Sequence, residues 1–129
     1  MTDPDFPQEL RAFIQENIPN IDAAELLLVL ARSPDRPHDL AAIAGELRPT
    51  VVPEPATRRY LMHFKERGLV VQLPDDNYQY HPVSPEIDAV VRALTKAYNE
   101  RPVTLVRLIY SLRDEKIRSF ADAFRLKKP

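Results

Sequence analysis

Apolar residues recur three and four positions apart along the first third of the chain, the spacing typical of amphipathic helices. Leu10, Ile14 and Ile18 form the first such stripe. The same spacing returns twice before residue 48. We therefore predict helices over 7–18, 20–33 and 39–47, and we expect the second of them to be central because its apolar positions are the most numerous.

Polar residues mark where several of these helices should begin. Asp22 followed by Glu25 resembles a capping box, and Asp39 is a suitable cap for the short helix after it. Ser84 followed by Pro85 is the usual start of a helix. With thirteen prolines and only two glycines, the helices are expected to lie between prolines, and the proline-rich segment 48–55 reads as a connector.

A glycine separates a helical pattern from a strand pattern in the middle of the chain. Tyr60, Leu61 and Phe64 share one face of a helix over 55–67 that should end at Gly68, because glycine readily adopts the positive φ that turns the chain. Two short apolar strands then surround the polar turn PDDN. This pattern predicts a β-hairpin over 69–83.

The last third of the chain is expected to be helical in three pieces. A helix beginning at Ser84 should stop near Pro102. The segment 103–112 is apolar at seven of ten positions, which lie nearly all round a helical wheel, so this helix should be buried on two sides. A separate amphipathic helix should follow from Ile117 to Phe124.

Length and charge limit the classes of protein to consider. The 129 residues suit one domain, and 44% hydrophobic with 29% charged residues is the composition of an ordinary folded protein. The net charge is −1, yet residues 1–47 carry nine acids and three bases, residues 48–100 seven of each, and residues 101–129 three acids and eight bases. The acidic N-terminal segment and the basic C-terminal segment suggest a partner that binds through opposite charge.

The residue types that most enzymes need are missing or badly spaced. The chain has no cysteine, and its three histidines, His38, His63 and His81, do not stand at metal-ligand spacing. Two glycines 23 positions apart cannot build a phosphate-binding loop or a nucleophile elbow. We therefore expect no catalytic activity, no metal and no cofactor. The start of the chain lacks the features of a signal peptide and no apolar run could span a membrane, so we expect a cytoplasmic location.

Three stretches carry a resemblance to a known family: DLAAIAGEL, PATRRYLMHFKERGLVVQ and the hairpin DDNYQYH. Together they resemble the winged helix-turn-helix domain of bacterial MarR-like regulators over about 21–83. The resemblance implies a mainly α fold with a small β-hairpin. It divides the chain into an N-terminal helix (1–19), a winged helix-turn-helix domain (20–83) and C-terminal helices with a short basic tail (84–129).

The same resemblance implies a cytoplasmic, DNA-binding transcriptional regulator. The helix 55–67 would enter the major groove of double-stranded DNA, the hairpin 69–83 would act as the wing, and the terminal helices would form a homodimer. Carried over by position, the residues implied to contact DNA are Ala56, Thr57, Arg58, Arg59, Met62, His63 and Arg67. Arg125, Lys127 and Lys128 at the basic end would reach DNA or the other subunit, or would only complement the dipole of the last helix.

Alternatives to DNA binding stay open. Bases outnumber acids four to one within 56–68, but Arg58 and Arg59 are equally suited to the solvated face of an amphipathic helix. The rival function is a winged-helix protein-interaction module that does not bind DNA, favoured by the acidic hairpin tip of Asp75 and Asp76. A small-molecule effector bound between the winged domain and the dimer helices is a third alternative.

Overall fold

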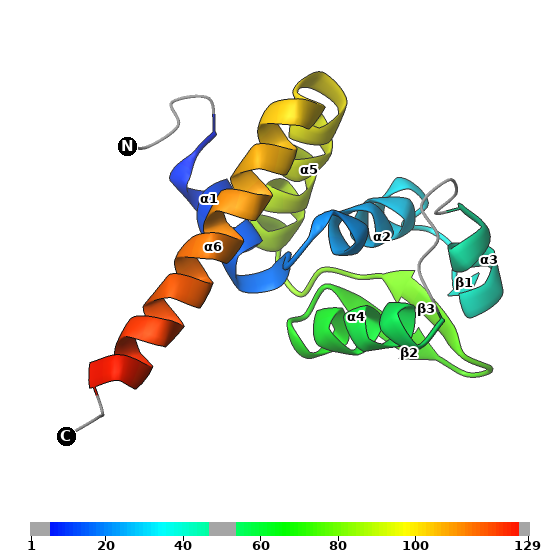
Figure 1. Cartoon of the computed structure of the whole chain (residues 1–129). Coiled ribbons are helices and arrows are strands. Elements are labelled where there is room, and N and C mark those ends of the chain that lie inside the picture. The colour runs from blue at the N-terminus through cyan, green and yellow to red at the C-terminus, as the bar shows by residue number, and fades with distance from the viewer. Residues whose placement is uncertain (1–5, 47–53, 127–129) are drawn as a thin grey trace.

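The computed structural model describes residues 6–46 and 54–126. Within these ranges the chain is mostly helical and carries a small three-stranded antiparallel sheet (Figure 1). The elements are α1 (Gln8–Asn17), α2 (Ile21–Arg32), β1 (His38–Asp39), α3 (Leu40–Glu46), α4 (Glu54–Glu66), β2 (Val70–Leu73), β3 (Asn77–Tyr80), α5 (Pro85–Glu100) and α6 (Pro102–Leu126).

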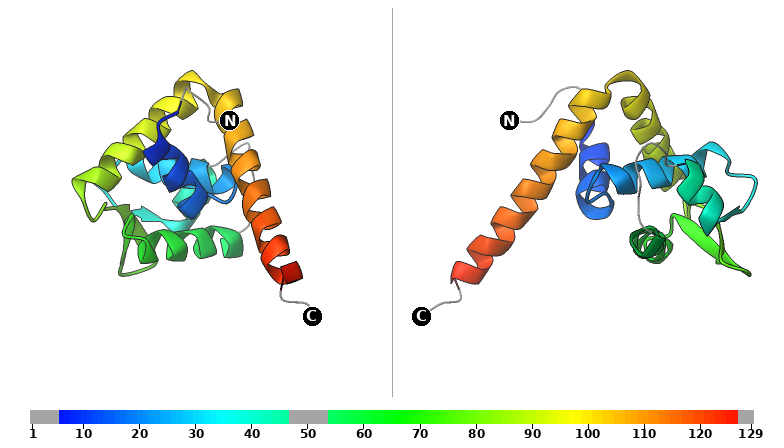
Figure 2. Two further views of the ribbon diagram at one scale, coloured as in Figure 1. Left: turned by 90° about the vertical axis from the view of Figure 1, so that its left-hand side faces the viewer. Right: turned by 45° about the vertical axis from the view of Figure 1, so that its right-hand side comes forward.

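The elements form two groups that share one core. Helices α1, α5 and α6 pack against one another at one side, and α2 leads from them to α3, α4 and the sheet at the other side (Figures 1 and 2). Seven of the twelve residues of α2 are buried, and this helix contacts α3, α4, α5 and β3. The prediction of a central second helix is therefore confirmed.

The sheet has the order β1-β3-β2, with β3 in the middle. The predicted hairpin is confirmed as β2 and β3, in which Val70 pairs with Tyr80 and Leu73 with Asn77. The two-residue strand β1 was not predicted, and it pairs His38 with Tyr78. A strand of two residues is too short to show the alternation of apolar and polar positions by which strands are found in a sequence.

Side-chain caps fix the starts of three helices. Asp39 accepts a hydrogen bond from the backbone N–H of Ala42 at 2.7 Å, and Ser84 accepts one from Ile87, as predicted. The cap of α2 is Asn20, whose Oδ1 accepts from the N–H of Ala23 at 2.9 Å, and not Asp22. Asn20 has the extended backbone that a capping residue needs, whereas Asp22 already lies inside the helix.

Gly68 connects α4 to the sheet as predicted. Its φ is +77°, and the N–H of Leu69 donates to the carbonyl of Phe64 at 2.9 Å, which closes the end of the helix. A Cβ at this position would lie 2.9 Å from Cγ1 of Val83. Leu69 and Phe64 consequently return to the same core, where each is at most 1% exposed.

One prediction for the last third of the chain is wrong, and a second, the burial of 103–112 on two sides, is met on only one side within the single chain. Residues 102–126 form one continuous helix of 25 residues, because Arg113, Asp114, Glu115 and Lys116 contain no helix breaker between the two apolar patterns. Segment 103–112 is buried on one side only, through the four residues Leu105, Leu108, Ile109 and Leu112, while Val103 is 64% exposed. Beyond Leu112 the helix leaves the body of the molecule (Figure 2).

The predictions for the connector 48–55 fall mostly outside the described residues, as do those for Lys127 and Lys128 in the basic tail. The helix predicted over 55–67 begins one residue earlier, at Glu54, and ends at Glu66. Among the described helices, no segment is both long enough and apolar enough to cross a membrane.

Candidate functional site

Helix α4 has one buried side and one side that faces away from the core. Thr57, Leu61 and Phe64 are fully buried, and their separations of four and three residues place them on a single stripe. Arg59 and Met62 lie on the other side and are exposed. The apolar stripe holds the helix against α2, α3 and β2, so the outer side is presented on a rigid element.

The outer side of α4 carries a shallow hollow of about 790 Å³. Its lining combines two arginines, one histidine and one glutamate with apolar surface: Pro55, Arg58, Arg59, Met62, His63 and Glu66. Four of the seven residues predicted to contact DNA are thus brought together on one surface. We call this surface the α4 face.

Arg58 is bound to the tip of the β2–β3 hairpin. Its Nη1 and Nη2 donate to Oδ1 and Oδ2 of Asp76 at 2.9 and 2.8 Å, a bidentate ion pair. The two side chains remain 42% and 44% exposed, so water still screens the pair. The pair joins the hairpin to the α4 face and engages both terminal nitrogens of the guanidinium.

The backbone of the hairpin tip has a conformation that suits aspartate at positions 75 and 76. Asp75 and Asp76 both have positive φ, of 63° and 60°, a conformation that aspartate tolerates better than most residues. Asn77 closes the turn by donating its side-chain N–H to the carbonyl of Pro74 at 3.0 Å. The backbone of the turn therefore fixes where the carboxylate of Asp76 meets Arg58.

The charges at this site follow from that contact. Hydrogen bonds from Arg58 lower the pKa of Asp76, so its carboxylate stays ionised at neutral pH and neutralises one arginine. Burial raises the pKa of the neighbouring Tyr78, whose hydroxyl lies 3.4 Å from Oδ1 of Asp76, and the phenol therefore stays neutral. Arg59 is left as the exposed cation of the hollow. Lys65, six residues further along α4, lies outside the hollow and donates to Oε1 of Gln72 at 3.1 Å.

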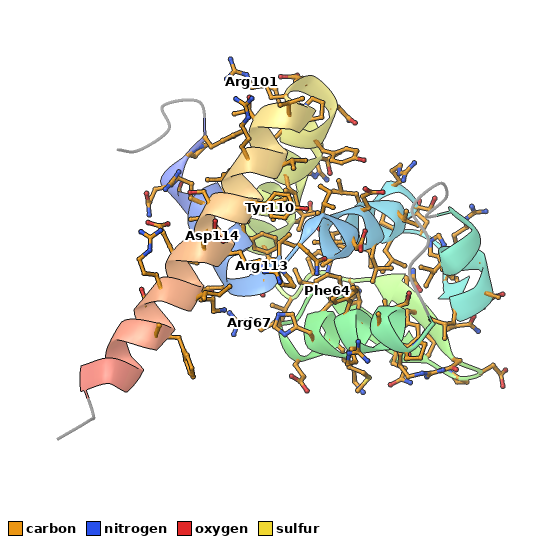
Figure 3. All side chains as sticks on the ribbon, viewed as in Figure 1. Phe64, Arg67, Arg101, Tyr110, Arg113 and Asp114 are labelled. Carbon is orange, nitrogen blue, oxygen red and sulfur yellow. The ribbon has the colours of Figure 1, made fainter. Side chains whose placement is uncertain are left out.

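Arg67 lies just beyond α4 and points toward α1 (Figure 3). Its Nε donates to Oδ1 of Asn17 at 3.0 Å and its Nη2 donates to Oε2 of Glu16 at 2.9 Å. Asn17 is itself buried and donates to the carbonyl of Phe13. Arg67 therefore ties the end of α4 to the first helix, and it does not belong to the α4 face.

The structure places three of the predicted contact residues outside the hollow. Thr57 is 0% exposed, so the prediction that it contacts a ligand is wrong. It belongs to the buried stripe because it stands four residues before Leu61. Ala56 is half-buried and packs against the core, and Arg67 is turned to α1.

Sequence reasoning missed three residues of the site. Pro55 and Glu66 line the hollow, and Asp76 holds Arg58. Helical spacing from Arg59 and Met62 would have found Pro55 and Glu66, which lie four residues away on either side. No local signal pairs Arg58 with Asp76, because 18 positions separate them and the contact depends on where the hairpin folds back.

Within residues 6–46 and 54–126, no group of three or more histidine, cysteine, aspartate or glutamate side chains is placed to hold a metal ion. Comparison of the chain with protein-family models, with curated proteins and with solved structures found no match.

Proposed function

We propose that this protein is a winged helix-turn-helix transcriptional regulator that binds double-stranded DNA through the α4 face. The observation that carries the proposal is the exposed, rigidly held surface with Arg59, Met62 and His63 at its centre. In this proposal α4 lies in the major groove and the β2–β3 hairpin beside it is the wing. The order α3, α4 and then a hairpin supports it.

The chemistry of the α4 face suits a base edge and a phosphate backbone. An arginine that reaches a guanine can donate two hydrogen bonds and contribute roughly 1–3 kcal/mol of discrimination against other bases. Each additional phosphate contact adds affinity that falls as salt rises, through the release of counterions. Arg59 lines the hollow and takes the first role in this proposal. Lys65, which is exposed outside the hollow and bonded to Oε1 of Gln72 on the hairpin, takes the second.

The second candidate function is a protein-interaction module that does not bind DNA. It is favoured by the acidic hairpin tip, where Asp76 neutralises Arg58 and Asp75 is exposed beside it. Both carboxylates would approach phosphate if the hairpin acted as a wing. A protein partner with basic groups would meet them without this repulsion.

A titration of a fluorescent random-sequence duplex, followed by polarisation at low salt, separates the two functions. DNA binding predicts a rise in polarisation whose midpoint moves to higher protein concentration as salt is added. The logarithm of the association constant should fall with the logarithm of the salt concentration, with a slope of about −0.9 for each phosphate contact. A flat titration at low salt contradicts the proposal and favours the protein-interaction module.

Under the DNA-binding proposal, Asp76→Asn should tighten binding. The substitution removes a negative charge from the wing and ends the ion pair between Asp76 and Arg58, so we expect the dissociation constant at low salt to fall by about threefold to tenfold and the salt slope to steepen by about one contact. The same polarisation titration measures both quantities.

Asp75→Asn is the matched control, since it removes the same charge from the neighbouring position without breaking the pair with Arg58. It should tighten binding by less than half as much on a logarithmic scale. If the two substitutions have equal effects, DNA binding depends on the charge of the hairpin tip and not on the ion pair between Asp76 and Arg58.

A further inference from the structure

A groove between the second half of α6 and the ends of α1 and α4 carries positive charge. Its volume is about 530 Å³, and its lining includes Arg113 and Lys116 of α6, His63 of α4 and Glu16 of α1. Glu16 is already paired with Arg67 at 2.9 Å. Arg113 and Lys116 are exposed, and across the described part of the chain neither of them makes an ion pair. The groove therefore presents two cations that the described residues leave without a fixed counter-charge.

The charged residues in this half of α6 differ between the two sides of the helix. Arg113 and Lys116 line the groove, whereas Asp114, Glu115 and Arg118 do not. Arg118 stands four residues after Asp114 and three after Glu115, the separations at which opposite charges on one helix attract each other. Neither Arg113 nor Lys116 has an acid three or four positions away. The side of α6 that lines the groove is therefore the more positive one.

His63 connects this groove to the α4 face, because it lines both the groove and the hollow of the α4 face. Beyond the groove, α6 continues past α4 on the side away from α2 (Figures 1 and 2). Figure 3 shows Arg113 close to the end of α4 at which Phe64 and Arg67 lie. Arg113 and Lys116 consequently flank the C-terminal end of the α4 face.

A duplex that received the outer side of α4 in its major groove would extend past this end of the helix. The major groove is about 12 Å wide, and the phosphates of both strands border it. Contacts to these phosphates fix the position and orientation of a protein on DNA without reading the sequence. Each cation that neutralises a phosphate also adds affinity through the release of counterions. Two cations beside the end of α4 are suited to this role.

We propose that Arg113 and Lys116 contact the phosphate backbone of the duplex that the α4 face binds, so that α6 is a second DNA-binding element beside α4. The inference rests on DNA binding by the α4 face. It concerns the middle of α6 and is separate from the basic end, since Lys116 precedes Arg125 by nine positions. The two contacts raise affinity for every duplex sequence alike, because phosphates are common to all of them.

The double variant Arg113→Gln with Lys116→Gln tests the proposal in the polarisation titration with random-sequence duplex. Glutamine is a good helix former and both side chains are exposed, so the melting temperature should not change. At low salt the association constant should fall by about tenfold. The slope of its logarithm against the logarithm of the salt concentration should become shallower by about 1.8, which corresponds to two lost phosphate contacts.

The matched control is Arg107→Gln with Arg118→Gln, which removes the same charge from the same helix. Both arginines are exposed and lie outside the groove. Because they act on the duplex only at long range through salt-screened attraction, their loss should weaken binding by less than about threefold. The salt slope of this control should change by less than about half a contact.

A spin label then locates the contact, and the absence of cysteine from the chain makes single labelling clean. A nitroxide on Lys116→Cys should lose mobility when duplex is added to saturation, whereas one on Arg118→Cys should keep it. An unchanged nitroxide on Lys116→Cys would overturn the proposal.

The titrations separate the failure of this proposal from the failure of DNA binding itself. A flat titration of the wild-type protein overturns both. A wild-type protein that binds duplex, with an Arg113→Gln and Lys116→Gln variant of the same affinity and salt slope, overturns only the contact by α6. Equal weakening by the two double variants also overturns it, because the total charge of α6 would then account for the effect.

Discussion

Phe64→Ala is expected to lower the free energy of unfolding by about 3–5 kcal/mol, the usual cost of removing a buried aromatic ring. Phe64 is 0% exposed and belongs to the stripe that holds α4 in place. Thermal melting followed by circular dichroism should show a midpoint lower by roughly 10–20 °C.

Met62→Ala is the control on the same helix. Met62 is 36% exposed on the α4 face, so the loss of its side chain should cost less than about 1 kcal/mol. If the two variants melted within a few degrees of each other, α4 would not be packed through the stripe of Thr57, Leu61 and Phe64. The presentation of the α4 face would then lose its physical basis.

The parts of the fold that sequence reasoning found are those specified by neighbouring residues. The hairpin and the junction at Gly68 depend on a glycine between a helical and a strand pattern, and the structure gives that glycine a φ of +77°. Ser84 and Asp39 cap helices because a short polar side chain reaches N–H groups only three residues away. The glycine junction and the two caps are each specified by residues that lie close together in the sequence, so they can be predicted without knowledge of tertiary packing.

The parts that it missed depend on distant contacts or on competing local signals. Strand β1 exists because His38 and Asp39 lie against β3, about forty positions away. Arg67 is turned to α1 by Glu16 and Asn17, about fifty positions before it, although the resemblance implied that it faces DNA from the helix 55–67. The continuity of α6 was missed because two apolar patterns of different width were taken for two helices.

The candidate site likewise combines residues that helical spacing predicts with contacts that depend on distant parts of the chain. The outward positions of Arg58, Arg59, Met62 and His63 follow from helical spacing once Tyr60, Leu61 and Phe64 are taken as the inner side. Thr57 was expected among the residues that contact DNA, and the structure assigns it to the inner side. The ion pair of Arg58 was not predictable, because it depends on the carboxylate of Asp76, which the folded hairpin brings to it.

Replacing Arg58 and Arg59 together with alanine should abolish specific duplex binding and weaken binding to random DNA by about a hundredfold at low salt, under the DNA-binding proposal. The effects of the two single variants should differ. Asp76 already occupies the outer edge of the Arg58 guanidinium, so Arg59→Ala should cost more affinity than Arg58→Ala. The polarisation titration measures all three, and unchanged melting temperatures would show that the variants remain folded.

The double variant Arg92→Ala with Lys96→Ala on α5 removes the same charge from an exposed surface away from the α4 face, and it should weaken binding by less than about threefold. The dependence of Arg58 on Asp76 can be measured as a coupling. In an Asp76→Asn background, Arg58→Ala should cost more affinity than it does in the wild-type background, because the carboxylate that competes with DNA for the guanidinium is gone. If Arg58→Ala has the same small effect in both backgrounds, Arg58 serves only to anchor the hairpin, and Arg59 alone carries recognition by the α4 face.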